Sequence, residues 1–207
     1  MSKTQKSKPK LIESPAVVSE KLPLFAALDL GTNSCRMLIA RPRKSDFEVI
    51  DAFSKTVYLG KGMDSSGKLS NSAMKRTISA LHVCQKKLIS NEVKYTRLVA
   101  TAACRQALNG REFIKRARKE SNLKLEIINP SEEARLAVIG SVGHLKPMTE
   151  QVLVVDIGGG STELVWLDLT NVEAKNRKNS IMMMQSNQLR KKELDKLTGV
   201  KVVDWIS

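Results

Sequence analysis

The sequence predicts an α/β fold, in which one lobe with a mixed sheet and flanking helices is followed by the first strands of a second, duplicated lobe. Two observations carry this prediction. A strand, a tight Gly/Ser/Thr turn and another strand occur around Asp29 and again around Asp156, 127 residues later, which is the length of a small domain. Between the two copies, apolar runs alternate with segments of helical periodicity.

The first lobe is predicted to span residues 22–147 and to begin with three strands. Apolar runs at 25–27 and 37–40 flank the first turn. Residues 47–53 alternate between polar and apolar side chains, as in a half-buried strand. Further strands are expected at 97–102 and 123–128, so that the strands later in the lobe alternate with helices.

Three helices are expected in this lobe. Ser70 follows a Gly-rich loop and is the expected N-cap of a helix that runs to about residue 89. The apolar residues of that helix fall on one face: Met74, Ile78, Leu81 and Leu88. Residues 111–121 are typical of a basic amphipathic helix, and Ser131 is the expected cap of a third helix.

The second lobe is predicted to occupy residues 148–207 and to be incomplete. A hairpin starts at Val152, and residues 200–206 are expected to form a third strand. Residues 171–197 are interpreted as a polar insertion, a long loop with a helix over 188–197 that stops at Gly199. A complete lobe needs roughly a hundred residues more. Residues 1–21 are predicted to be a disordered basic tail.

The charge of the chain restricts its partners. A net charge of +14, from 35 Lys and Arg against 21 Asp and Glu, favours nucleic acid, an anionic membrane surface or a phosphate polymer. The alternative is a basic surface with no specific partner. The few aromatic residues do not alternate with basic ones as in a base-stacking platform, so nucleic acid is the less favoured partner.

The cysteines and the hydropathy pattern predict a cytoplasmic protein. Cys35, Cys84 and Cys104 are scattered and odd in number, which argues against a disulfide framework or a zinc site. No apolar run reaches the roughly 18–20 residues of a membrane span, and the N-terminus lacks the apolar stretch of a signal peptide.

The first turn, residues 29–34 (DLGTNS), has the composition of a phosphate-binding loop. Gly31 lets backbone amides approach an oxyanion without a side chain in the way. Thr32, Asn33 and Ser34 add hydroxyl and amide donors. Asp29, at the end of the strand, is placed to orient water or a hydrated Mg²⁺ beside the phosphates.

The second turn repeats this arrangement. Three glycines, Gly158, Gly159 and Gly160, offer successive amides for an anion-binding nest and are followed by the hydroxyls of Ser161 and Thr162. Asp156 repeats the role of Asp29, and Glu163 adds a carboxylate for metal or water. Either turn alone is also compatible with an ordinary hairpin turn, whereas the matched pair favours phosphate binding.

Residues 62–69 (GMDSSGKL) match all but the last position of a nucleotide P-loop. Leu69 stands where the hydroxyl that holds Mg²⁺ should be, and no strong strand runs into the segment. We therefore interpret these residues as an ordinary loop.

Two further features are ambiguous from residue chemistry alone. Glu132 and Glu133 fall in the first turn of a predicted helix, where acids complement the helix dipole whether or not they have another role. Arg105 follows the predicted strand at 97–102, where it is compatible with a phosphate contact or with ordinary surface charge.

Taken together, four motifs give the chain a strong resemblance to the exopolyphosphatase and guanosine pentaphosphate phosphohydrolase (Ppx/GppA) family, within the superfamily that shares the actin and hexokinase fold. They are residues 27–34 (ALDLGTNS), 100–107 (ATAACRQA), 131–136 (SEEARL) and 156–164 (DIGGGSTEL). Their order and spacing match too, over about residues 23–168. The resemblance implies an actin-like, ribonuclease H-like lobe, and the chain is similar to such a protein truncated at its C-terminus.

The resemblance also implies hydrolysis of terminal phosphoanhydride bonds with Mg²⁺ as cofactor. By position, Glu133 resembles the general base and Arg105 an arginine that faces the substrate. Asp156, Gly158 and Glu163 match the metal and phosphate site, and Gly31, Asn33 and Ser34 match the first phosphate loop.

Three hypotheses remain open from the sequence. The favoured one is a Mg²⁺-dependent phosphohydrolase of polyphosphate or guanosine pentaphosphate, acting alone or as a homodimer. The second is a truncated, non-catalytic lobe that binds a polyanion or a partner chain. The third is an ATP-dependent kinase of the same fold, which is less favoured because a kinase needs no water-activating acid at the start of the Glu-Glu-Ala-Arg helix.

Overall fold

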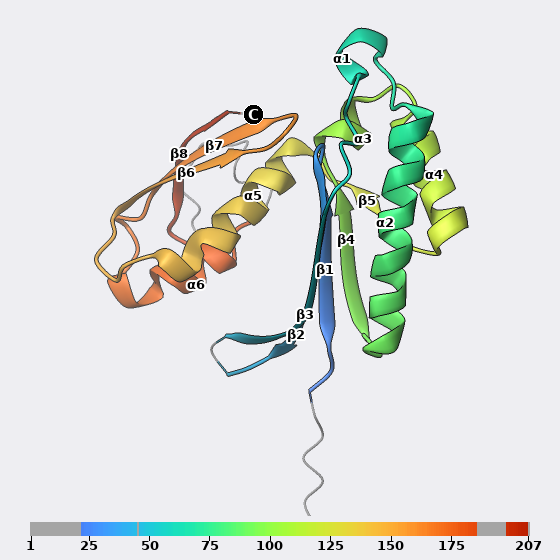
Figure 1. Cartoon of the computed structure of the whole chain (residues 1–207). Coiled ribbons are helices and arrows are strands. Elements are labelled where there is room, and N and C mark those ends of the chain that lie inside the picture. The colour runs from blue at the N-terminus through green and yellow to red at the C-terminus, as the bar shows by residue number, and fades with distance from the viewer. Residues whose placement is uncertain (1–21, 45, 186–197, 207) are drawn as a thin grey trace, which may run out of the picture.

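The computed structural model describes residues 22–44, 46–185 and 198–206, and contains two sheets (Figure 1). The first sheet has five strands in the order β3-β2-β1-β4-β5. The strands are β1 (Phe25–Leu30), β2 (Ser34–Pro42), β3 (Phe47–Thr56), β4 (Tyr95–Ala100) and β5 (Glu126–Ile127). β1, β2 and β3 pair antiparallel, whereas β4 and β5 are parallel to β1, so the predicted mixed sheet is confirmed.

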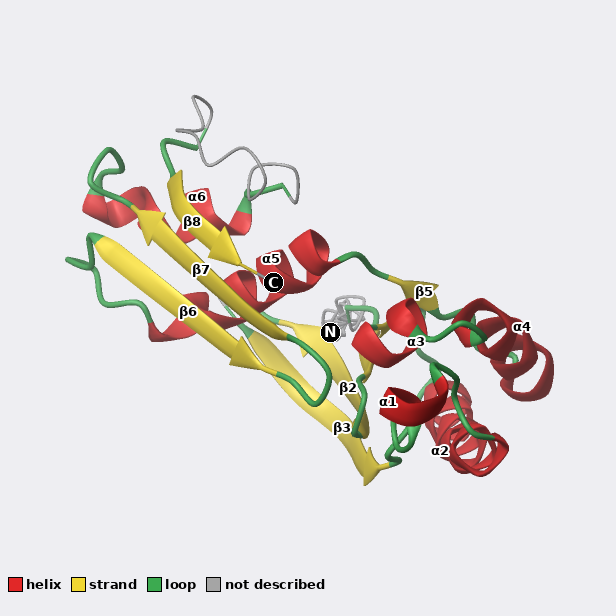
Figure 2. Ribbon diagram, turned by 90° about the horizontal axis from the view of Figure 1, so that it is seen from above, coloured by secondary structure: helices red, strands yellow, loops and turns green. Residues whose placement is uncertain are grey.

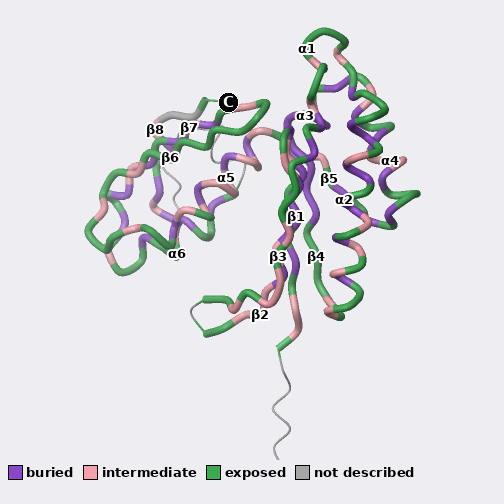
Figure 3. Tube along the Cα trace, in the orientation of Figure 1, coloured by how far each residue is buried: buried purple, intermediate pink, exposed green. Residues whose placement is uncertain are grey.

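Helices cover one face of this sheet. α2 (Asn71–Ser90) and α4 (Gly110–Ser121) lie side by side along it, and the short helices α1 (Met63–Ser66) and α3 (Ala102–Gln106) lie near its upper end (Figure 1). Ser70 caps α2 as predicted, since its side chain accepts a hydrogen bond from the amide of Ala73 at 3.2 Å. The apolar face of α2 packs against alternate residues of β1 and β2 in one core, drawn in purple in Figure 3.

The second sheet is antiparallel, with the order β6-β7-β8. Its strands are β6 (Gln151–Ile157), β7 (Thr162–Asp168) and β8 (Lys201–Ile206), so the predicted hairpin and third strand are both present. α5 (Pro130–Ser141) begins beside the end of the first sheet and runs along the second, together with α6 (Arg177–Met182) (Figures 1 and 2). Ala134 and Val138 of α5 pack with Val165 and Leu167 of β7 in a separate core.

Several predicted boundaries are wrong. β5 pairs with β4 at only two positions, although Leu123 and Leu125 outside it still fill the core. β4 starts two residues earlier than predicted and ends at Ala100, because the chain turns there into α3.

The predicted cap of α5 is also wrong. Asn129, rather than Ser131, is the N-cap: its Oδ1 accepts a hydrogen bond from the amide of Glu132 at 2.9 Å. Pro130 occupies the first helical position, where its missing N–H is not needed and its φ is already suitable. Ser131 instead donates its hydroxyl to Asn129 Oδ1 at 2.7 Å.

Part of the predicted polar loop is helical. The 3₁₀ turn Ala174–Asn176 leads into α6, in which Arg177 and Ile181 are buried one turn apart. Arg177 donates from Nε to the carbonyl of Val172 at 3.0 Å, so this buried charged side chain binds the start of α6 to the loop before it. The predicted helix over 188–197 and the predicted tail over 1–21 lie outside the described residues.

The lobe boundary at 147/148 stays a prediction, and α5, which precedes it, contributes to the second core. A 3₁₀ turn, Val142–His144, links α5 to the loop before β6. Among the helices that the structure describes, none is both long enough and apolar enough to cross a membrane.

Candidate active site

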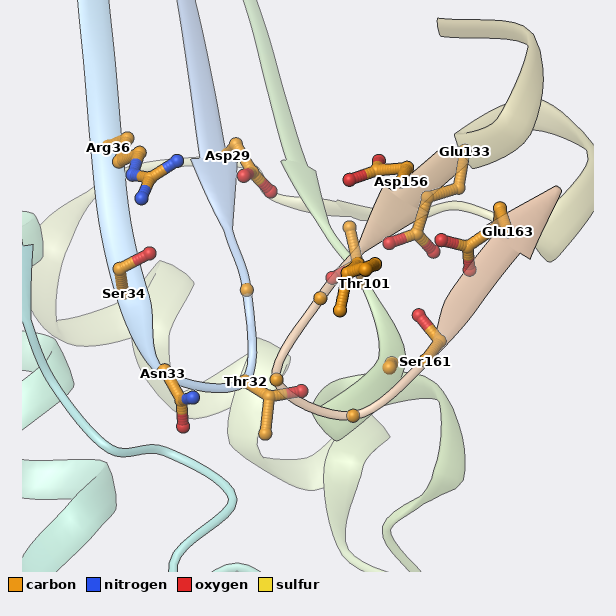
Figure 4. A pocket seen from close by; sticks show the side chains of 16 residues that line it. Asp29, Thr32, Asn33, Ser34, Arg36, Thr101, Glu133, Asp156, Ser161 and Glu163 are labelled. Carbon is orange, nitrogen blue, oxygen red and sulfur yellow. The ribbon is translucent and has the colours of Figure 1, made fainter. Parts of the chain in front are cut away.

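The two Gly-rich turns face each other across a cavity of about 310 Å³ (Figure 4). The first turn joins β1 to β2 and the second joins β6 to β7, so each lobe contributes one wall. The lining consists of glycines, hydroxyl and amide side chains and charged groups: Asp29, Gly31, Thr32, Asn33, Ser34, Arg36, Thr101, Ala102, Glu133, Asp156, Ile157, Gly158, Gly159, Gly160, Ser161 and Glu163.

The two turns have the same internal geometry. The amide of Gly31 donates to the carbonyl of Ser34 at 2.9 Å, and the amide of Gly158 donates to the carbonyl of Ser161 at the same distance. Because both hairpins close through a Gly–Ser pair three residues apart, the repeat seen in the sequence is also a repeat of backbone structure.

Two glycines of the second turn lie against side chains of the first. A Cβ atom on Gly159 would lie 2.4 Å from Nδ2 of Asn33, and one on Gly160 would lie 2.4 Å from Oγ1 of Thr32. The side chain of Gln106, in α3, reaches the carbonyl of Gly160 at 3.4 Å. Glycine therefore lets the two walls approach closely at this end of the cavity.

Four carboxylates line the cavity. Asp29 lies near the end of β1, Asp156 near the end of β6 and Glu133 in the first turn of α5, and Glu163 pairs directly with Asp156 across the β6–β7 ladder. Glu133, Asp156 and Glu163 lie close together on one side in Figure 4, with Asp29 across from them. The carboxylates converge although they come from four separate elements.

Burial, together with this concentration of negative charge, raises the pKa values of two of these carboxyl groups. The pKa of Asp29 is raised first by burial and then by repulsion from Glu133, while Arg36 lowers it and Asp156 adds a smaller repulsion. The pKa of Glu163 is raised by burial and then by repulsion from the same two carboxylates, although a hydrogen bond with Ser161 opposes this. The four carboxylates therefore repel one another unless a proton or a cation neutralises part of their charge.

The carboxylates fit a magnesium ion whose remaining coordination positions are filled by water or a bound phosphate. Within residues 22–44, 46–185 and 198–206, no three acidic, histidine or cysteine side chains are grouped closely enough to form a metal cage by themselves. However, Glu163 is 1% exposed and its Oε1 has no hydrogen-bond partner in the described part of the chain. Mg²⁺ commonly uses one or two carboxylates, water and phosphate oxygens, which this arrangement allows.

Arg105 lies beside Glu133 and outside the cavity lining. Its Nη1 donates to Glu133 Oε2 at 2.8 Å and to the carbonyl of Ile128 at 3.0 Å. The ion pair is only 18% and 15% exposed, so the guanidinium holds the Glu133 carboxylate in a defined place.

The neighbouring acid, Glu132, has different partners. It forms two hydrogen bonds with Arg135, at 2.7 and 2.8 Å, and an ion pair with Arg97 at 2.8 Å. These interactions, with that of Arg135 first, hold the pKa of Glu132 below its ordinary value. Glu132 thus fixes the start of α5 to β4, while Glu133 faces the cavity.

The structure brings most of the predicted site residues together. All of them line the cavity except Arg105, which touches Glu133, and Thr162, which is exposed and lies on the strand face opposite Glu163. Two lining residues were not predicted from the sequence. Arg36 lies two residues after Ser34 and so on the same face of β2. Thr101 follows β4.

Replacing Glu163 by glutamine is expected to stabilise the protein at pH 7 by on the order of 1 kcal/mol, because a neutral amide avoids the cost of burying a charged carboxylate. Because the pKa of Glu163 is raised, the folded state binds the proton more tightly than the unfolded state, and the free energy of unfolding falls as pH rises above the ordinary value of 4.5. Urea unfolding at about pH 7 and pH 4 measures this difference, which is expected to vanish at the lower pH.

Glu112, an exposed acid of α4, supplies the control for this measurement. The Glu112→Gln variant is expected to change stability by less than about 0.5 kcal/mol at either pH. A Glu163→Gln variant that is less stable than the wild type at pH 7 would contradict the expectation.

Comparison with known proteins identifies a matching family and similar solved structures. A family model described as the Ppx/GppA phosphatase family matches residues 38–181. The crystal structure of the Aquifex aeolicus member of the Ppx/GppA protein family is similar with 34% identity and a TM-score of 0.63, over 70% of this chain and 47% of that one. An exopolyphosphatase from Cytophaga hutchinsonii is similar with 30% identity and a TM-score of 0.65, over 69% and 46%. The chain thus spans about half the length of these structures.

Proposed function

Because the chain belongs to the Ppx/GppA phosphatase family, we propose that it hydrolyses the terminal phosphoanhydride bonds of inorganic polyphosphate or guanosine pentaphosphate. The observation that carries this proposal is the pair of matching Gly-rich turns on opposite walls of a cavity that also holds four carboxylates. The turns suit a run of phosphates, and the carboxylates suit a water molecule and a cation.

In the proposed reaction, Glu133 is the general base. Its carboxylate accepts a proton from a water molecule whose oxygen attacks the terminal phosphorus, and the bond to the bridging oxygen breaks to give orthophosphate and a shortened substrate. Arg105 keeps the carboxylate in position through the 2.8 Å ion pair. Phosphoryl transfer passes through a loose transition state, so placing the water and the phosphate supplies much of the catalysis.

The glycine turns are proposed to hold the phosphates. Gly31 with Thr32, Asn33 and Ser34 would bind from the first lobe, and the amides of residues 158–160 with Ser161 from the second. Arg36, which lines the same cavity, adds a positive charge beside Asp29 and across from the other three carboxylates. Thr162 lies outside the cavity lining, so we propose no direct contact for it.

The proposed cofactor is Mg²⁺, with Asp29, Asp156 and Glu163 as the residues that would hold it. When bound, the ion would neutralise charge on the phosphates. The raised pKa values of Asp29 and Glu163 support a cation here, because each carboxylate becomes easier to ionise beside a positive charge.

Phosphate release from polyphosphate and from guanosine pentaphosphate, with Mg²⁺ or with EDTA, tests the proposal. We expect release with Mg²⁺ and a loss of at least about a hundredfold with EDTA, since the ion neutralises much of the phosphate charge. Release that is unchanged by EDTA would exclude the metal role.

Two other outcomes separate the alternatives. If the folded chain binds polyphosphate and releases no phosphate with either substrate, it is a non-catalytic polyanion-binding lobe. Transfer of phosphate from ATP to an acceptor would identify a kinase. The same assays at several protein concentrations test the prediction of a homodimer, because turnover per chain would rise with concentration.

A further inference from the structure

The outer face of the second sheet, which points away from α5 and α6, is exposed and apolar (Figure 2). Its side chains come from alternate positions of β6 and β7 and from the end of β8: Leu153, Val155, Ile157, Leu164, Trp166 and Ile206. Five of the six are between 46% and 77% exposed, and Leu164 is half-buried. Contiguous apolar patches of this kind mark interaction sites on soluble proteins.

The equivalent face of the first sheet is covered by a helix. β6 and β7 repeat β1 and β2 with the same offset of 127 residues as the two turns, and the two ladders have the same register. The first-lobe counterparts of the β6 and β7 residues are therefore Ala26, Leu28, Leu30, Met37 and Ile39. These side chains are at most 5% exposed, because they form one core with α2. In the described part of the chain, no helix lies on the matching face of the second sheet.

The size of the sheet side chains specifies the helix that fits this face. The buried residues of α2 recur every three or four positions, as in an amphipathic helix. On the second sheet, Trp166 stands where the first sheet has Ile39, and Leu153 stands where it has Ala26. A helix that packs closely here thus needs small residues, such as alanine, over the larger sheet side chains. The net charge of +14 favours acidic residues on the other sides of that helix.

We propose that the outer face of the second sheet binds an amphipathic α-helix of a partner polypeptide, packed as α2 packs on the first sheet. The helix has alanine and leucine toward the sheet and acidic residues toward water. A second copy of the chain offers no such helix among its described residues, because the apolar faces of α2, α4 and α5 are packed in their own cores. Of the six residues only Ile157 also lines the cavity between the lobes, so the proposal is independent of the proposed hydrolysis.

Fluorescence titration with a synthetic peptide tests this docking surface, since Trp166 is 46% exposed and reports on its own burial. The probe has 20 residues, the length of α2, with alanine and leucine on one helical face and glutamate on the others. We expect a saturable blue shift of the emission that is absent from the Trp166→Phe variant. A peptide of the same composition, with its leucines distributed around the helix, is expected to bind at least about tenfold more weakly.

Leu153→Ser is expected to weaken peptide binding by on the order of tenfold, because one apolar contact is lost. Ile89→Ser is the matched control, since Ile89 is an aliphatic residue of α2 that is 68% exposed, against 63% for Leu153. It is expected to change the affinity less than about twofold, as a distant and independent site. Equal weakening by both substitutions, equal affinity for the two peptides, or no binding to the wild type would each overturn the proposal. A homodimer that Leu153→Ser dissociates, with no peptide binding, would assign this face to a second copy instead.

Discussion

Replacing Glu133 by glutamine is expected to lower phosphate release by roughly 10²–10⁴-fold, the usual contribution of a general base. Glutamine keeps the volume of the side chain, and its carbonyl oxygen can still accept the hydrogen bond from Arg105 Nη1. It cannot take a proton from water at neutral pH. The loss is therefore expected in kcat more than in KM, because the turns that hold the phosphates are unchanged.

The measurement is phosphate release by Glu133→Gln beside the wild type, with urea unfolding to show that the variant is folded. Glu112→Gln removes an equal charge from an exposed position of α4 and is expected to keep at least about half of the wild-type rate. Wild-type turnover in Glu133→Gln would show that another group activates the water, with Asp156 and Glu163 as the nearest candidates on that wall.

Replacing Gly110 by alanine is expected to destabilise the protein by about 3 kcal/mol, the upper part of the usual range for an overpacked site. Gly110 is buried at the start of α4, and an added Cβ atom would lie 2.0 Å from the carbonyl oxygen of Cys104. The obstructing atom belongs to the backbone of α3, so no side-chain rotation relieves the clash. Relief requires α3 and α4 to move apart, and α3 also carries Arg105.

Gly140→Ala is the matched control, because a Cβ atom there would meet no atom within 4 Å. Gly140 lies inside α5, where alanine has the higher helix propensity, so this variant is expected to be more stable by about 0.5–1 kcal/mol. Urea unfolding of both variants measures the contrast. A Gly110→Ala variant as stable as the wild type would show that the two helices separate without cost.

The larger elements of the fold were predictable because periodicity and caps agree there. Residues 71–90 repeat apolar side chains at helical spacing after a serine cap, and the structure has α2 at those positions. The bounds of the short strand β5 were harder to predict, because Leu123 and Leu125 are buried by packing and not by strand pairing. Hydrophobicity marks burial, and only the register of neighbouring strands decides where the pairing ends.

The repeated turns made the site recognisable in the sequence. That its side chains lie together could be seen only in the structure. The sequence places Asp29 and Asp156 at equivalent positions, but Glu132 and Glu133 are adjacent and chemically identical. The resemblance singles out Glu133 by its position, and the structure gives the physical reason: Arg97 and Arg135 bind Glu132, whereas Glu133 faces the cavity. Arg36 has a weaker signal, a charged residue on the same face of β2 as Ser34, which the alternation of strand residues can reveal.

α5 connects the two sheets, so a rotation of the helix about one end would displace its other end. Its first turn is held by Asn129, Arg97 and Arg105, while the rest of the helix packs on the second sheet. With twelve residues rising about 1.5 Å each, the helix is roughly 18 Å long. A tilt of about 10° around the held end would move the far end by roughly 3 Å but Glu133 by less than about 1 Å. A rotation of the second lobe about this end would therefore displace the Glu133 carboxylate much less than the far end of the helix.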